Sequence, residues 1–203
     1  MQTTESSLRA LAALLGGLPS VLGFILGFLS AVFAEPVRQW LYRPRLLLSF
    51  GSSSDFVTPT PETAGGRQYE AFYIRLKVVN SRSRLAKACR AYLVRVEKQV
   101  DGEFKPTMYC DSMQLAWSAR GDEAFTAIDL PRDVPQFVDI VSTRSIFHTF
   151  APAIRLVPFR YKELFEETGV FRFRVQVSGD GVDPVSDQVI LHWEGTWNKF
   201  RVE

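Results

Sequence analysis

The sequence predicts an all-β fold, an antiparallel β-sandwich preceded by one N-terminal transmembrane helix. Apolar and polar residues alternate with a period of two in 69–80 and in 170–177, which is typical of strands that bury one face. Turn residues separate roughly eight such short strands, and no helices alternate with them, which favours an antiparallel sandwich over a parallel sheet. Ahead of the strands, residues 10–34 contain no charged side chain.

The charge-free run 10–34 predicts the membrane helix. Its 25 residues would form a helix roughly 37 Å long, against about 30 Å of hydrocarbon in a bilayer. Apolar residues occupy every face of this helix, whereas a helix in a soluble core usually keeps a polar stripe. Residues that suit the headgroup level follow the run: Arg38, Trp40, Tyr42, Arg43 and Arg45. We therefore expect an uncleaved anchor.

Two other interpretations of this run stay open. Val32-Phe33-Ala34 before Glu35 resembles a signal-peptidase site, which would make the segment a cleaved export signal. Against that, the run exceeds the apolar stretch of about 7 to 15 residues in a typical signal peptide. The other interpretation is a buried helix of a soluble core.

Flanking charges predict the orientation of the anchor. Three arginines follow the run within 38–45, whereas Arg9 alone precedes it. Basic residues near a span tend to remain in the cytoplasm. We therefore expect a single-pass cell-membrane protein with a cytoplasmic soluble domain, in which Cys89 and Cys110 stay reduced; export after signal cleavage is the alternative.

Small residues recur every four positions on one face of the predicted helix, at Gly23, Gly27 and Ala31. Such faces let two helix backbones approach closely in lipid and gain packing contacts. The pattern predicts a homo-oligomer formed through the transmembrane helix.

Charge counts and composition divide the chain into three parts: a short tail (1–9), the transmembrane helix with its interfacial segment (10–42) and a β-sandwich domain (45–203). The first 45 residues carry four basic and two acidic side chains, and the remainder carries 20 of each. A neutral domain lacks the positive charge of nucleic-acid-binding proteins, so we expect no nucleic acid partner.

The soluble part is predicted to begin with a strand at 46–50 and an exposed loop at 51–67, which is rich in Ser, Thr, Pro and Gly. After the alternating strand 69–80, weaker strands are predicted at 89–99, 113–117, 124–130, 136–141, 153–157 and 187–193. Asp101-Gly102 suits a tight reversal. One short helix is predicted at 160–169, closed by Gly169.

Two stretches resemble bacterial immunoglobulin-like domains of the cell-adhesion-related type. "YIRLKVVNSRSRLAKACRAYLVRVE" is similar to their strand, Asn-containing turn and strand, and "GVFRFRVQVSGDGVDPVSDQVILHWEGTW" is similar to their closing hairpin. The resemblance covers 69–197 in pieces and implies an immunoglobulin-like sandwich that serves as a spacer or binding module. Cys89 and Cys110 lie too close together in sequence, with Trp117 after both, for the bridged arrangement of antibody domains.

No catalytic, cofactor or metal-binding pattern is present. His148 and His192 share no ligand spacing with each other or with the cysteines, and the aspartates of 180–187 suit a turn better than calcium. We therefore expect no enzyme activity and no cofactor. Trp193 and Trp197 are candidate partner-contact aromatics; alternatively, both rings cover the open end of the sandwich.

These observations predict a membrane-anchored, non-enzymatic interaction or sensing module with a cytoplasmic β-sandwich. Its expected partners are membrane lipid, an unknown protein and a second copy of the chain. One alternative is a membrane effector or accessory subunit that acts through oligomerisation of the transmembrane helix. Another is an enzyme whose site the sequence does not reveal.

The first testable prediction concerns retention of the anchor. The intact mass of the protein purified from membranes should correspond to a chain that still contains 10–34, because the apolar run is too long for a typical signal peptide. A mature protein that starts at Glu35 would contradict the anchor and place the domain outside the cell.

Overall fold

The computed structural model describes residues 23, 27, 28, 32–34, 37, 42–51, 53–147 and 149–203. The chain divides into two units, Met1–Arg43 and Pro44–Glu203, so the second unit begins one residue before the boundary predicted at 45. Among the described residues, no helix is both long and apolar enough to cross a membrane.

Most of the predicted anchor, 10–42, lies outside the described residues, including three of the positions named above: Ala31, Arg38 and Trp40. Gly23 and Gly27 are helical, and a Cβ added at either would meet no described atom within 4 Å. The anchor and its helix-association face therefore stay predictions.

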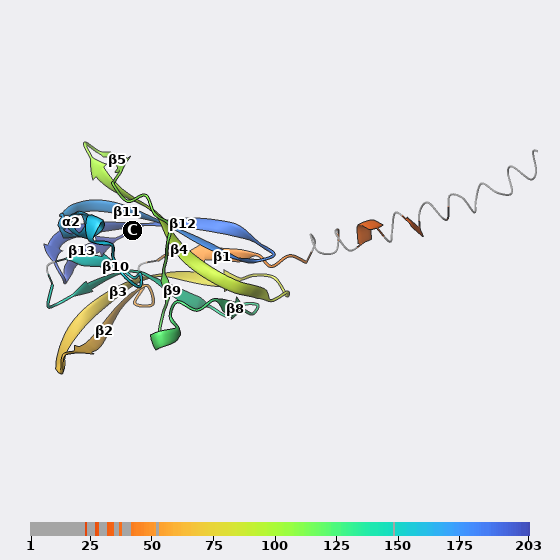
Figure 1. Cartoon of the computed structure of the whole chain (residues 1–203), viewed down its shortest axis with the longest axis horizontal. Helices are drawn as coiled ribbons and strands as arrows, with labels where there is room; N and C mark the ends of the chain where they lie inside the picture. Colours follow the sequence, from red (N-terminus) through yellow and green to blue (C-terminus); the bar gives the residue numbers. More distant parts are fainter. Residues whose placement is uncertain are drawn as a thin grey trace, which may run out of the picture. The chain divides into compact units, whose positions relative to one another are not determined.

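Two antiparallel sheets form the second unit (Figure 1). The first sheet runs in the order β1 (Leu46–Ser49), β3 (Arg67–Asn80), β9 (Gln136–Arg144) and β10 (Phe150–Pro152), with β2 (Val57–Ala64) on β3 and β7 (Ala116–Trp117) on β9. The second runs in the order β13 (Lys199–Val202), β12 (Val182–Thr196), β11 (Gly169–Asp180), β4 (Ala86–Val100) and β5 (Glu103–Pro106), with β6 (Met113–Gln114) and β8 (Ile128–Leu130) on β4. Three short helical segments accompany the sheets: η1 (Gly121–Glu123), η2 (Phe159–Tyr161) and α2 (Lys162–Glu166).

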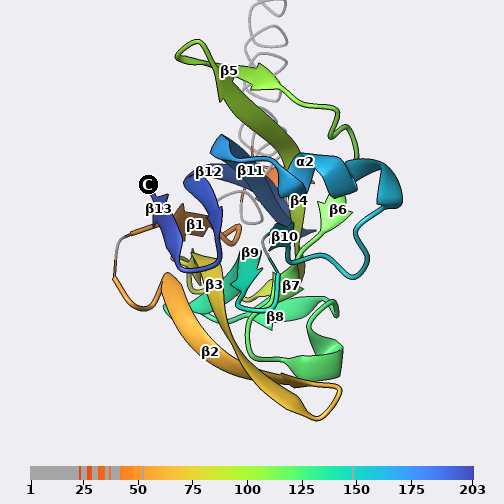
Figure 2. The same cartoon turned by 90° about the vertical axis from the view of Figure 1, so that its left-hand side faces the viewer.

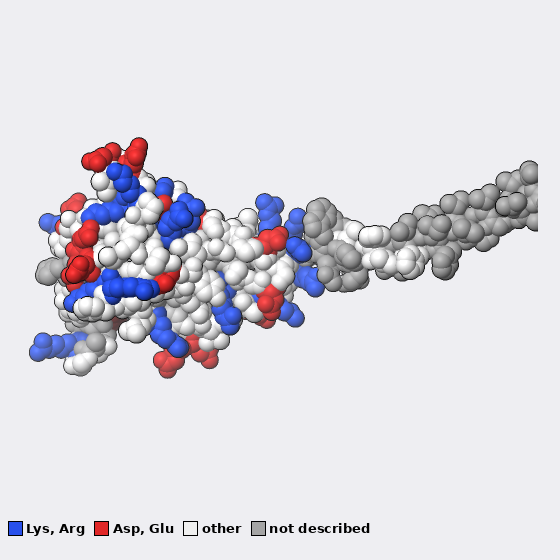
Figure 3. All heavy atoms as spheres, turned by 45° about the horizontal axis from the view of Figure 1, so that its top comes forward, with Lys and Arg blue, Asp and Glu red and all other residues white. Residues whose placement is uncertain are grey.

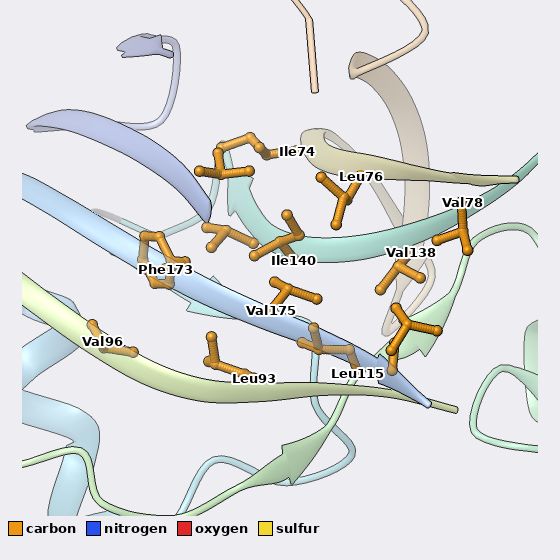
Figure 4. Close-up of a cluster of buried hydrophobic side chains, with 14 of the residues drawn as sticks. Ile74, Leu76, Val78, Leu93, Val96, Leu115, Val138, Ile140, Phe173 and Val175 are labelled. Carbon is orange, nitrogen blue, oxygen red and sulfur yellow. The ribbon is translucent and has the colours of Figure 1, made fainter. Parts of the chain in front are cut away.

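Apolar side chains from both sheets meet between them (Figure 4). Those labelled on β3, β4 and β11 are at most 1% exposed: Ile74, Leu76, Val78, Leu93, Val96, Phe173 and Val175. On β3 and β11 the neighbours of these residues point outward, as the period of two in 69–80 and 170–177 predicts. The all-β, antiparallel prediction with one short helix is confirmed.

The exposed loop predicted at 51–67 is wrong, because most of it forms β2 in a hairpin with β3. Pro59 and Pro61 made the segment resemble a loop. The backbone amide of Arg75 donates to the carbonyl oxygen of Phe56 at 2.8 Å, and alternate residues of an antiparallel ladder face the partner strand. Both prolines therefore fall on the side of β2 that faces away from β3, where a missing amide removes no hydrogen bond from the ladder.

The strand predicted at 153–157 is also misplaced. The strand in this part of the chain is β10, which ends at Pro152. Residues 153–157 form the loop that follows it, and within this loop Ile154 makes an isolated bridge to Leu115. β5 and β13 were not predicted. The tight reversal at Asp101-Gly102 is confirmed, since both residues have positive φ angles, 56° and 83°.

The segment 113–117 passes from one sheet to the other. β6 pairs with β4 of the second sheet, whereas β7 pairs with β9 of the first. Between them, the amide of the fully buried Leu115 donates to the carbonyl of Ala91 at 2.9 Å. This crossing joins the sheets along one side and brings the start of the loop after β7 beside β9 of the first sheet (Figure 2), where the amide of Ser118 donates to the carbonyl of Phe137 at 2.8 Å.

Asn80, at the end of β3, is fully buried and uses the whole hydrogen-bonding capacity of its side chain. Its amide nitrogen donates to the carbonyls of Arg84 at 2.7 Å and Leu130 at 3.0 Å. Its amide oxygen accepts from the backbone amides of Arg82 at 3.1 Å and Arg45 at 3.3 Å. One side chain thus joins the chain before β1, the turn after β3 and the end of β8.

Replacement of this amide should destabilise the domain severely. Asn80→Asp keeps the size but removes the donors to two carbonyls and buries a charge. We expect a loss of about 3 kcal/mol or more in the free energy of unfolding, because each buried polar group left unpaired costs about 1–3 kcal/mol.

The measurement is a thermal melt of the full chain in an uncharged detergent, followed by circular dichroism. Asn198→Asp is the matched control, because Asn198 is exposed in the turn between β12 and β13. Equal melting temperatures for the two variants would contradict the role of Asn80.

Candidate functional site

A groove of about 650 Å³ lies on the outer face of the first sheet. β3 and β9 form its floor, and the loops 118–125 and 153–157 form its walls. Four arginines from these elements line it, and we call it the arginine groove: Arg75, Arg120, Arg144 and Arg155. The same lining contains one carboxylate, Asp139. The groove therefore carries an excess of positive charge.

A β-bulge in β9 places the second floor arginine, Arg144, on the outer face beside Arg75. Val138 and Ile140 of β9 are buried, so simple alternation would also turn Arg144 inward. The register with β3 shifts instead: Ile74 pairs with Val141 and Arg75 with Asp139, which leaves Ile140 as an extra residue. Beyond this bulge Arg144 shares the outer face with Asp139.

Arg144 is held by carboxylate and phenol groups. Its Nε donates to Glu62 Oε2 at 2.9 Å, and its Nη2 lies 3.5 Å from the hydroxyl of Tyr73, which donates to Glu62. Burial, with the hydrogen bond to Glu62, raises the pKa of Tyr73 to about 12. Burial alone would raise the pKa of Glu62, but hydrogen bonds from Arg144, Tyr69 and Tyr73 bring that pKa below its usual value. At neutral pH, Glu62 and Arg144 of this network are charged and the Tyr73 hydroxyl is neutral.

Two of the other groove arginines, Arg120 and Arg155, do not contact carboxylate groups among the described residues. Arg120 donates to the neutral amide oxygen of Gln136 at 3.2 Å, and the guanidinium of Arg155 lies 5.5 Å from the centre of the Phe125 ring. Within the described part of the chain, neither forms a salt bridge with a carboxylate. Two exposed guanidinium groups are thus free to bind oxygen atoms from another molecule.

Arg75 and Asp139 lie together on the floor. Arg75 Nε is 3.6 Å from Asp139 Oδ1, and among the described atoms this buried Nε has no hydrogen-bond partner. Burial raises the pKa of Asp139, although the hydroxyl of Ser118 donates to it and Arg75 is nearby. Asp139 is the one carboxylate among the residues that line the groove, and it lies beside Arg75.

The positive groove is a local feature of the surface. Basic and acidic side chains are interspersed over the face in Figure 3, and the remainder of the chain after residue 45 is neutral by count. The positive charge at the groove thus comes from the arrangement of its own side chains, rather than from the net charge of the whole domain.

The structure does not bring the predicted contact residues to this groove. Trp193 is only 2% exposed, with its ring 5.7 Å from that of Phe150, so its prediction as a partner contact is wrong: its ring fills the core. Trp197 is half-buried and stacks on Phe72 at 5.4 Å. The described headgroup-level residues are exposed: Tyr42, Arg43 and Arg45.

The remaining reactive side chains stay apart. Cys89 is buried, and burial together with the charges of Asp129 and Asp180 raises its thiol pKa to about 11. Cys110 is exposed, 3.5 Å from the hydroxyl of Tyr161, and both thiols are free. His148 lies outside the described residues. No cluster of three or more His, Cys, Asp or Glu among the described residues is arranged to hold a metal.

The sequence patterns predicted the outward direction of only one of the four groove arginines. Arg75 was visible as an outward residue of the alternating strand 69–80, but Arg120 and Arg155 lie in loops and Arg144 depends on the bulge. A comparison of the chain with protein-family models found no match, and neither did a comparison with curated proteins.

The Glu62 network should make stability depend on pH. Because the folded-state pKa of Glu62 is lowered, its stabilising contribution is complete above its unfolded pKa of about 4.5 and is lost as the pH falls through the folded value. The melting temperature of the wild type should therefore exceed that of Glu62→Gln at pH 7. This difference should begin to shrink as the pH falls below about 4.5 and should approach zero once Glu62 is protonated in the folded protein, as thermal melts across the pH range would record. A difference that is independent of pH would contradict this account.

Proposed function

We propose that the protein is a membrane-anchored, non-enzymatic interaction module that recognises an anionic partner at the arginine groove. The observation that carries this proposal is the arginine groove itself, in which Arg120 and Arg155 lack carboxylate partners among the described residues. A guanidinium offers several donors in a planar fork that matches carboxylate and phosphate oxygens. Groups of this kind bind and orient anions.

The domain architecture suits this role. The antiparallel two-sheet fold is compatible with the immunoglobulin-like sandwich expected from 69–197, an architecture used for spacers and binding modules. The anchor at 10–42 and a cytoplasmic location for the domain belong to the same proposal and rest on the apolar run and its flanking arginines. Self-association through Gly23, Gly27 and Ala31 would place two or more grooves on one assembly and strengthen binding to a multivalent partner.

The groove proposal predicts opposite effects of neighbouring substitutions. The full chain in an uncharged detergent is titrated against a fluorescein-labelled poly-glutamate peptide, with binding followed by fluorescence anisotropy. Arg120→Gln combined with Arg155→Gln should weaken binding about tenfold, because each exposed charge pair contributes at most about 1 kcal/mol. Asp139→Asn keeps an acceptor for Ser118 but removes the opposing charge, so it should strengthen binding a few-fold.

Arg90→Gln is the matched control, because Arg90 is exposed on β4 of the other sheet. It should leave the affinity unchanged. A control that weakens binding as much as the groove variant would show binding to overall charge, and absence of binding to the wild type would refute the proposal.

A further inference from the structure

A second hollow of about 420 Å³ adjoins the arginine groove. The two share three lining residues, Arg144, Ala151 and Val157. Three of the six other residues that line this second hollow are aromatic: Phe147, Phe150 and Phe165. The other three are Thr149 and the salt-bridged pair Lys162 and Glu166, whose charged atoms lie 3.7 Å apart. A bound molecule that follows the surface would therefore pass from guanidinium groups directly to an apolar depression.

Large apolar side chains stand exposed beside both hollows. Leu156, a wall residue of the groove, is 80% exposed, and Phe147, a wall residue of the second hollow, is 52% exposed. Single exposed apolar residues need no explanation, but two such residues in the linings of two adjoining hollows are typical of a surface that another molecule covers.

The floor arginines are recessed, which limits the class of molecule that can bind to this surface. The side chains of Arg75 and Arg144 are only 19% and 28% exposed. A flat bilayer surface does not reach recessed guanidinium groups, whereas carboxylates on an extended chain can enter a groove. Each hollow alone has the volume of a small-ligand site, which is about 300–1,000 Å³, so the pair suits a chain segment with several side chains.

From this geometry we infer that the arginine groove and the adjoining hollow form one site for an acidic peptide segment of a protein partner. Carboxylates of the segment bind Arg75, Arg120 and Arg155, and a bulky apolar side chain next to them fills the hollow beside Phe147. The inference rests on the proposed anion recognition and adds the class of partner and an apolar specificity.

Two labelled peptides of equal charge test the inference with the full chain in an uncharged detergent. One contains a leucine between runs of glutamate, and the other has serine in its place. The leucine peptide should bind about tenfold more tightly, because a buried leucine side chain gains far more from leaving water than a serine does. Phe147→Ser should remove this preference and leave the serine peptide unaffected. Ile146→Ser, the control at an exposed neighbour that lines neither hollow, should preserve the preference.

The outcomes separate the two proposals. If neither peptide binds, anion recognition itself is wrong and the inference falls with it. If both bind equally, anion recognition stands and the inference is overturned. Displacement of the leucine peptide by soluble dihexanoylphosphatidylserine, at concentrations at which a neutral short-chain lipid has no effect, would assign the site to a lipid headgroup and also overturn the inference.

Discussion

The buried amide of Asn80 is the constraint on which the arrangement of the sandwich depends. Its four hydrogen bonds reach the entry to β1, the turn between β3 and β4, and the end of β8. Strands of both sheets therefore meet at one buried polar side chain. A fully satisfied amide of this kind fixes the relative positions of the strands, because any shift leaves a buried donor or acceptor unpaired.

The arginine groove follows from two irregularities in this frame. The extra residue at Ile140 turns Arg144 to the outer face of the first sheet, and the crossing at 113–117 brings the following loop to the same face. Neither irregularity disturbs the core, where Ile140 and Leu115 remain fully buried. The scaffold thus places charged groups without exposing its apolar interior, as expected when binding residues lie on a rigid sheet and its loops.

The sequence predicted the regular parts of the fold and missed the irregular ones. Alternation identified β3 and β11 because β3 buries every second residue from Ile74 to Asn80 and β11 does so from Phe171 to Val177. β2 was missed because Pro59 and Pro61 are compatible only with an edge strand, a property of the sheet rather than of the segment. Arg144 could not be assigned to the groove, since its direction depends on a bulge defined by the pairing of β9 with β3. Trp193 was open to either interpretation because tryptophan suits both cores and interfaces.

Strand order also governs when the domain can form during synthesis. Val96 of β4 pairs with Phe173 of β11, so the centre of the second sheet joins segments that are far apart along the chain. Pairings this distant along the chain close slowly. A nascent chain that has just passed β10 contains both β3 and β9, which pair with each other, yet β4 still lacks its principal neighbour. A chain that ends there would leave the inner face of β4 without its neighbouring strand, and apolar surface exposed in this way is prone to aggregation.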